Sequence, residues 1–326
     1  MAHITRRELM LAFMAGLLAK HASAQVLPAN ARIIVGFTPG SGVDLVARRL
    51  ANELTGKLAG AIIVDNRTGA SGNIAVSAAL AAAPDGTTLI SNPSGVLTVN
   101  PHTFRKLGFS PFKDLQPVSL VCRYELGLAV GPAVPESVKT LPDFTAWVRQ
   151  QRQVVAYGSP ATGSGLHFMA HAYSRSQRLN MVHVPYRGAG PMIVDILGGQ
   201  IAAGAGSLPA LMAQATNGRL RVLASTGVGR SRFFPSVPTF EEQGVRGLGM
   251  REWHGIYIGG KPDAKVLDHL VTLVQSAVKT PAFAEAIAKQ GFEAVASSPQ
   301  ELDQLARADS ERWGEIVKTS GFVQES

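Results

Sequence analysis

Residues 32–54 read RIIVGFTPGSGVDLVARRLANEL and contain the pattern that decides the fold. Residues 32–37 form an apolar run of strand length, and the turn-forming residues 38–42 end it. Residues 43–54 then place apolar side chains at four-residue spacing, which predicts an amphipathic helix. A strand, a glycine turn and a helix in direct succession are typical of α/β proteins.

The same alternation of strand and helix continues along the chain and predicts mostly parallel sheets flanked by helices. Strands are predicted at residues 61–65, 87–91, 126–130, 154–157, 181–184, 200–205, 220–225 and 253–259, and helices at 73–83, 141–152, 164–176, 190–197, 208–216, 263–279, 281–289 and 298–319. The last helix has a clear start, because Ser298 and Glu301 have the spacing of a capping box.

A chain of 326 residues is long enough for two domains of about 150 residues each. The apolar runs 118–130 and 250–259 are the candidates for segments that cross between two lobes. The predicted first lobe is therefore discontinuous and comprises residues 25–124 and 249–326, while the second comprises 125–248.

Composition excludes several classes of protein. With 46% apolar and 17% charged residues, the chain is neither disordered nor a coiled coil. Its formal charge of +8 favours anionic partners, but the arginines are scattered with little aromatic interleaving, so no nucleic-acid surface is predicted. The single cysteine, Cys122, excludes an intramolecular disulfide and the usual all-cysteine zinc sites.

Residues 1–24 have the features of an export signal. Arg6 and Arg7 precede an apolar run at 9–18, and small residues at 22–24 suit a signal peptidase. Paired arginines are compatible with a twin-arginine address or with an ordinary secretory signal, and both alternatives stay open. We expect a soluble, periplasmic mature protein. Removing the segment lowers the formal charge from +8 to +6, since three basic residues and one acidic residue leave with it.

Four turns rich in glycine and hydroxyl groups follow predicted strands, at residues 38–42, 91–95, 159–164 and 187–190. At the carboxyl ends of strands, helix N-termini present free N–H groups with a partial positive charge, and glycine lets a ligand approach the backbone. Any one of these turns could be an ordinary loop. The four together predict a site for a carboxylate or a phosphate.

Other chemistry is less well supported. The run Gly40-Ser41-Gly42 imitates a dinucleotide fingerprint, but Leu45 stands where a third glycine is required and Asp44 would face the pyrophosphate. No Gly-x-Ser-x-Gly elbow and no acid/base pair is found in the sequence, so no catalytic nucleophile is indicated.

His167 and His171 could face one metal on a helix, but Phe168 replaces the glutamate of a zinc protease, which favours packing or surface roles for both histidines. Trp253 is expected to fill the core between the lobes, with a place along the cleft as the alternative.

The sequence resembles the periplasmic substrate-binding proteins of tripartite tricarboxylate transporters, the Bug (Bordetella uptake gene) family. The resemblance covers nearly the whole mature chain and rests on IVGFTPGSGVD at 34–44, VDNRTGASGNI at 64–74 and VHVPYRG at 182–188. Further matching motifs lie at residues 83–86, 100–101, 117–120, 157–159, 197–200 and 235–239.

The resemblance implies a two-lobed, type II periplasmic-binding-protein (Venus flytrap) fold that closes on a small organic carboxylate. It also implies delivery of that ligand to a membrane permease, by a monomer that holds no cofactor or metal and catalyses no reaction. Carried over by position, the ligand-binding residues are Phe37, Gly40, Ser41, Gly42, Asp44, Ser94, Ser159, Thr162, Gly163, Ser164, Ala189, Gly190, Gly206 and Ser207.

Two departures from the family pattern bear on the ligand. Gly206 stands where the family often has an acid, which predicts a different ligand, or one with more negative charge or bulk. Ser41 replaces a common glycine and adds a hydroxyl donor or fills space. A periplasmic sensor and an exported, cofactor-dependent oxidoreductase remain as alternative functions.

Overall fold

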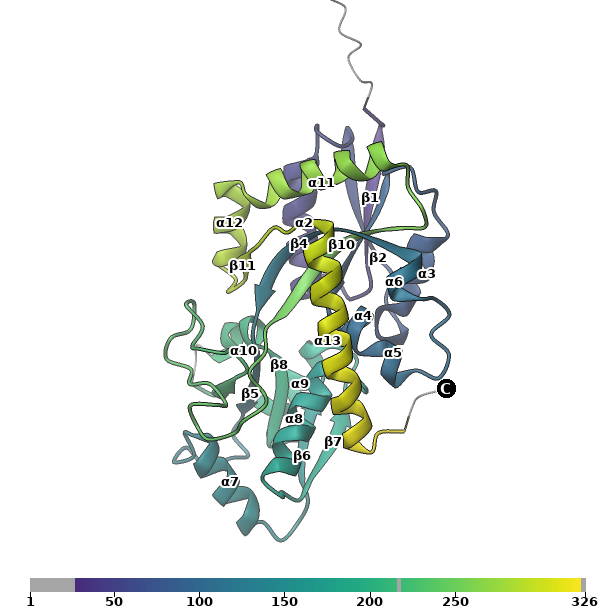
Figure 1. The fold of residues 1–326 in the computed structure, drawn as a ribbon. Coiled ribbons are helices and arrows are strands. Elements are labelled where there is room, and N and C mark those ends of the chain that lie inside the picture. The colour runs from purple at the N-terminus through teal and green to yellow at the C-terminus, as the bar shows by residue number, and fades with distance from the viewer. Residues whose placement is uncertain (1–26, 216–217, 324–326) are drawn as a thin grey trace, which may run out of the picture.

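The structure is a computed structural model that describes residues 27–215 and 218–323. It contains two mixed β-sheets flanked by helices, one in each of two lobes (Figure 1). The predicted export signal at residues 1–24 lies outside the described residues. Along the part of the chain described, every helix is too short or too polar to cross a membrane.

The first lobe is built around a six-stranded sheet with the strand order β11-β4-β10-β3-β1-β2. Strands β1, β2 and β3 are parallel, while β10 runs antiparallel to both β3 and β4. The strands are β1 (Asn30–Val35), β2 (Ala61–Asn66), β3 (Thr88–Pro93), β4 (Leu115–Tyr124), β10 (Glu252–Gly259) and β11 (Glu293–Ala294). The helices of this lobe are α2 (Gly42–Leu54), η1 (Ala70–Gly72), α3 (Asn73–Leu80), α4 (Gly95–Thr98), α5 (Asn100–Thr103), α6 (Pro111–Asp114), α11 (Ala264–Val278), α12 (Pro281–Ala288) and α13 (Pro299–Ser320).

The second lobe is built around a five-stranded sheet with the order β7-β6-β8-β5-β9. Strands β6, β7 and β8 are parallel, and β5 runs antiparallel to β8 and β9. The strands are β5 (Leu126–Val130), β6 (Val155–Ser159), β7 (Met181–Pro185), β8 (Ala203–Ser207) and β9 (Arg221–Ser225). The helices are α7 (Leu141–Gln150), α8 (Gly165–Ser176), α9 (Ala189–Leu197) and α10 (Leu208–Gln214).

Alternation along the strands explains how both faces of the first sheet are covered. Ile33 and Val35 pack with the buried face of α2, whereas Ile34 packs on the opposite side with α3 and α13. Helix α2 buries Val46 and Leu50 completely, so the four-residue spacing in the sequence marks its core-facing side.

The carboxyl ends of the parallel strands in the two sheets face each other. The chain passes from the end of β4 into the start of β5 through Glu125, and it returns from the end of β9 into the start of β10. Arg251 Nε lies 3.1 Å from Glu125 Oε1, and Leu126 N donates to Thr226 Oγ1 at 3.0 Å. The two crossing segments are therefore tied together at the border between the lobes.

Helix α13 makes a third connection between the lobes. It begins beside the first sheet and continues along α8 of the second lobe (Figure 1). Near its end, Arg175 of α8 donates to the carbonyls of Thr319 and Ser320 at 3.2 and 3.1 Å. Ser298 and Glu301 form the predicted capping box at its start.

The sequence-based strands and helices are largely confirmed, with differences in the first crossing run and in several short elements, which include η1 and β11. The predicted crossing run 118–130 is two strands, because the chain breaks at Glu125 between β4 and β5. The short helices α4, α5 and α6 were not predicted, because four residues are too few to show a helical period.

Candidate functional site

The four glycine turns lie at the facing carboxyl edges of the two sheets. Residues 38–42 follow β1 and residues 91–95 span the end of β3, both in the first lobe. Residues 159–164 follow β6 and residues 187–190 follow β7 in the second lobe. The topology thus brings together turns that are far apart in the sequence, such as 38–42 and 187–190.

Asp44 organises the first turn from inside the protein. Its side chain is 1% exposed and accepts hydrogen bonds from Gly40 N at 2.8 Å, Asn66 Nδ2 at 2.9 Å and Arg48 Nε at 3.0 Å. Burial alone would raise the pKa of Asp44, but these hydrogen bonds and the Arg48 charge together hold it below its usual value. The carboxylate is ionised and its oxygens already accept hydrogen bonds within the protein, so Asp44 positions the turn. It also takes the Gly40 N–H that a pyrophosphate would need.

Ser41 is the residue of the first turn that has an unused donor. Its Oγ is buried and has no hydrogen-bond partner among the described residues. Gly40 has a φ of +81°, which favours glycine, and Gly42 packs so closely that a Cβ there would lie 2.8 Å from Phe292 Cζ. Phe37 is half-buried, and its carbonyl accepts from Asn66 Nδ2 at 3.0 Å.

Ser94 links the second turn to a carboxyl group that the sequence analysis missed. Its backbone N donates to Trp253 O at 2.8 Å, and its Oγ donates to Glu252 Oε2. Ser94 is 1% and Glu252 8% exposed. Trp253 is buried, as expected, but it packs in the core of the first lobe and not between the lobes. Its Nε1 donates to Asp309 Oδ2 of α13 at 2.7 Å.

The two turns of the second lobe are joined by backbone hydrogen bonds. Tyr186 N donates to Ser159 O at 2.9 Å, and Gly188 N donates to Pro160 O at 3.0 Å. Ser164 is the N-cap of α8, where its Oγ accepts from His167 N at 3.3 Å. These bonds leave the start of α8 directed toward the first lobe.

Two stacked imidazoles support the third turn. The ring centroids of His167 and His183 are 3.8 Å apart, His183 Nε2 is 2.8 Å from Ser159 Oγ, and Gly163 N donates to His167 Nδ1 at 3.2 Å. The pKa is lowered to about 3 for His167 and to about 4 for His183. Burial is the larger cause in both, and neighbouring histidines are the smaller one. Both rings are neutral at pH 7, and the packing role expected for His167 fits this geometry.

His171, the second histidine of the predicted pair, points its ring edge toward His167 with centroids 6.1 Å apart. Burial lowers the pKa of His171 as well. Within residues 27–215 and 218–323, no cluster of histidine, cysteine and acidic side chains has the geometry of a metal site.

The third turn touches the first lobe and α13. A Cβ on Gly163, whose φ is +64°, would lie 3.2 Å from Thr103 Cβ of α5 and 3.3 Å from Phe322 Cζ. A Cβ on Gly165 would lie 3.0 Å from Trp313 Cζ2 and 3.6 Å from Glu252 Oε1. The first turn of α8 therefore lies against Glu252, at the junction of the two lobes.

The remaining predicted residues have different surroundings. Thr162 and Ala189 are half-buried, and Gly190 is exposed, with nothing within 4 Å of an added Cβ. Ser207 lies at the end of β8 as the N-cap of α10. Gly206 is buried in β8, where an added Cβ would lie 3.0 Å from both Leu211 Cγ and Leu211 Cδ2. A side chain at this position would press against α10.

Three buried polar side chains at the strand ends have unused hydrogen-bonding capacity. The hydroxyls of Ser91 and Ser225 and both amide atoms of Asn92 lack a partner within the described part of the chain, and all three residues are 0% exposed. Such atoms usually bind water or a ligand. Asn92 lies inside the turn selected from the sequence, whereas Ser225 carried no signal there. Glu252 was detectable only as a charge in an otherwise apolar strand.

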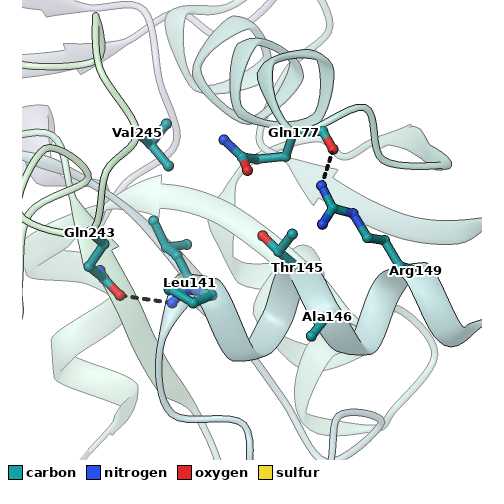
Figure 2. Close-up of a pocket in the computed structure, with 8 residues that line it drawn as sticks. Leu141, Thr145, Ala146, Arg149, Gln177, Gln243 and Val245 are labelled. Atoms are coloured by element: carbon teal, nitrogen blue, oxygen red, sulfur yellow. Dashed lines mark hydrogen bonds between the residues drawn. The ribbon is translucent and has the colours of Figure 1, made fainter.

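Two cavities lie away from these turns. One, of about 220 Å³, is formed by α7, the end of α8 and residues 243–245 (Figure 2). The other, of about 210 Å³, lies between residues 27–28, 85–87 and α11. None of the predicted ligand-binding residues lines either cavity.

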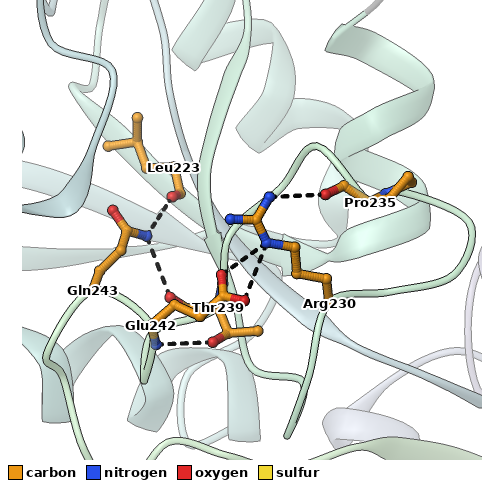
Figure 3. Close-up of polar contacts among 6 residues, drawn as sticks. All are labelled: Leu223, Arg230, Pro235, Thr239, Glu242 and Gln243. Carbon is orange, nitrogen blue, oxygen red and sulfur yellow. Dashed lines mark hydrogen bonds and ion pairs between the residues drawn. The ribbon is translucent and has the colours of Figure 1, made fainter.

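The first cavity is bounded by a hydrogen-bonded part of the segment that returns to the first lobe. Gln243 accepts from Leu141 N at 2.8 Å (Figure 2) and donates to Leu223 O at 2.9 Å (Figure 3). Beside it, Arg230 Nε lies 2.9 Å from Glu242 Oε2 (Figure 3). These polar contacts fix the course of the returning segment over the second lobe.

Residues 46–322 match the family model described as the tripartite tricarboxylate transporter family receptor. This chain belongs to that family. BugT of Bordetella pertussis is 32% identical over 301 residues, which cover 92% of each protein. The resemblance to the Bug family is thereby confirmed.

Solved structures agree with this family and with the two-lobed periplasmic-binding-protein fold. Rhodopseudomonas palustris Rpa4515, solved with adipate, is 28% identical with a TM-score of 0.84, covering 91% of this chain and 98% of that one. MatC of the same species, solved with malate, has a TM-score of 0.80 at 24% identity, covering 88% of this chain and 98% of that one. Two structures similar to this chain were therefore solved with a dicarboxylate, adipate in one and malate in the other.

Proposed function

We propose that this protein is an extracytoplasmic solute receptor that binds a small organic carboxylate between its lobes. The ligand lies among the turns at 38–42, 91–95, 159–164 and 187–190, and the receptor delivers it to a tripartite tricarboxylate-type membrane permease. It acts in the periplasm as a monomer, without cofactor or catalysis. Residues 25–124 and 249–326 form one lobe, and 125–248 form the other.

The observation that carries this proposal is the set of unused donors at the facing strand ends. Ser41 Oγ and the Asn92 amide are buried without partners among the described residues. The first turn of α8 lies against Glu252, which accepts from Ser94 of the turn that contains Asn92. Neutral donors of this kind favour a carboxylate, which accepts several hydrogen bonds at once. The adipate and malate bound by related proteins support this class of ligand.

Hinge motion would occur where the chain crosses between the lobes. Glu125 and Arg251 are paired across the two crossing segments, so they hold the pivot while the turns move together. The glycine at position 206 packs against Leu211, so a ligand amine would find no acid there. We therefore propose ligands without an amine, such as di- and tricarboxylates.

A thermal-shift screen with adipate, malate and citrate tests the proposal. A ligand at about 100 times its dissociation constant adds roughly 2.7 kcal/mol to the free energy of unfolding. Ser41→Ala should weaken binding about tenfold if Ser41 Oγ donates to the ligand. The control is Ser77→Ala on α3, whose hydroxyl already donates to Asn73 O at 3.1 Å. No response to any carboxylate, or preference for aspartate over plain dicarboxylates, would contradict the proposal.

A further inference from the structure

Glu252 is a buried acid placed between ligand-binding turns of opposite lobes. It begins β10, and because β10 is antiparallel to β3, it lies at the edge where β3 ends in the second turn. Ser94 Oγ of that turn donates to Glu252 Oε2. The other oxygen, Oε1, is 3.6 Å from the Cβ position of Gly165 in the first turn of α8.

The second oxygen of Glu252 is left for another partner. Oε1 accepts no hydrogen bond from any of the residues that the structure describes, and it faces the N-terminal turn of α8, directly after Gly163 and Ser164. This is also the region into which the proposed carboxylate binds. A ligand held by the start of α8 would therefore lie beside Oε1.

The charged and titratable groups that interact with Glu252 come from α13 and β4. Helix α13 contributes Asp309, whose charge opposes ionisation of Glu252, and Arg312, whose charge favours it. Strand β4 contributes Tyr124, whose own pKa is raised by burial and by Glu252. Burial is the largest influence and raises the pKa of Glu252 to about 7, while the hydrogen bond from Ser94 lowers it.

We propose that Glu252 determines specificity for anions by binding a carboxylate ligand in its protonated form. The inference rests on the proposed function. A neutral carboxylic acid can donate its O–H to an oxygen of the ligand, whereas an ionised Glu252 would repel that oxygen at close range. Binding of the carboxylate therefore takes up one proton wherever the unliganded protein has Glu252 ionised.

The sign of the pH dependence follows from this uptake. Below the pKa of Glu252 the acid is already protonated, so affinity for an anion is independent of pH. Above it each ligand must bring a proton, and affinity falls by up to tenfold per pH unit. An ammonium ligand would show the opposite trend, since it pairs with the ionised form.

Calorimetric titration of adipate or malate tests the proposal, between about pH 6.5 and 9, in two buffers of different ionisation enthalpy. For the wild type we expect proton uptake that approaches one per ligand above neutral pH. Glu252→Gln retains a neutral donor, so it should bind with little or no proton uptake and with affinity independent of pH. The control Glu311→Gln removes an exposed carboxyl from α13 and should behave as the wild type.

The outcomes separate the two proposals. If neither adipate nor malate nor citrate binds the wild type, the proposed function fails and the role of Glu252 falls with it. If a carboxylate binds the wild type without proton uptake, the proposed function stands and the role of Glu252 is overturned, whether or not Glu252→Gln folds. If Asp309→Asn loses the uptake while Glu252→Gln keeps it, the proton belongs to Asp309 and the proposal is wrong.

Discussion

The facing edges of the two sheets hold their turns by different chemistry. In the first lobe, the ionised carboxylate of Asp44 fixes the turn at 38–42, and the carboxyl of Glu252 accepts from Ser94. In the second lobe, the neutral imidazoles of His167 and His183 contact Gly163 N and Ser159 Oγ. A glycine turn can therefore be fixed by a charged carboxylate or by neutral imidazoles, and the choice decides how its stability responds to pH.

Glu252 and the histidine pair respond to pH in opposite directions. The pKa of Glu252 is raised to about 7 in the folded protein, so its contribution to stability is lost as the pH rises through 7. The pKa values of His167 and His183 are lowered to about 3 and about 4, so their contribution is lost as the pH falls below the unfolded value of about 6.5. In the wild type these effects partly cancel.

The largest expected effect is on stability at low pH in a variant that lacks the Glu252 carboxyl. In Glu252→Gln, acidification from about pH 7 to about pH 4.5 should lower the free energy of unfolding by at least roughly 4 kcal/mol, after allowance for partial exposure of the histidines. His167 and His183 contribute to this loss together with His171 and the buried His254, whose pKa values are lowered as well. Urea unfolding at a series of pH values measures this loss.

The double variant Glu252→Gln/His183→Gln should lose less, because His183 no longer contributes. The loss does not disappear, because His167, His171 and His254 keep their lowered pKa values. His269→Gln, an exposed histidine on α11, is the matched control in the same background and should leave the profile unchanged. If acidification lowered the free energy of unfolding equally with and without His183, the histidine pair would not explain how the stability of the second lobe depends on pH.

A smaller effect tests the charged acceptor of the first lobe. Asp44→Ala leaves Gly40 N–H and the Asn66 amide without their acceptor and removes the partner of Arg48, so we expect a loss of about 3 kcal/mol in stability. The control is Asp65→Asn, which breaks the exposed pair with Arg67 and should cost less than about 1 kcal/mol. Equal losses in the two variants, measured by urea unfolding, would refute the special role of Asp44.

The sequence predicted the turns more completely than the contacts between them. Strand and helix periodicity, followed by glycine and hydroxyl residues, was sufficient to select Ser41, Ser94 and Ser164, because local chemistry determines turns. The stacking of His167 on His183 and the approach of Glu252 to Gly165 depend on how distant segments meet. No local pattern contains that information, so these contacts required the structure.

Gly206 is a second position whose surroundings did not follow from the sequence pattern. The family pattern drew attention to an acid that is absent at this position, but the pattern carries no direction for the side chain. In the structure, an added Cβ points toward Leu211 of α10. The close packing of β8 against α10 is therefore an explanation for the glycine at position 206, beside ligand chemistry.

The smallest effect concerns the place where the two edges touch. Gly163 has a φ of +64°, and an added Cβ would lie 3.2 Å from Thr103 Cβ and 3.3 Å from Phe322 Cζ, whereas a Cβ on Gly190 would meet nothing within 4 Å. Gly163→Ala should therefore lose about 1 kcal/mol from backbone strain and crowding, while Gly190→Ala should change the free energy of unfolding by less than about 0.5 kcal/mol. Because the Gly163 contact joins the lobes, Gly163→Ala should also reduce the melting shift produced by a saturating carboxylate. A Gly163→Ala protein as stable as Gly190→Ala, with the full ligand shift, would mean that the third turn does not touch the first lobe in solution.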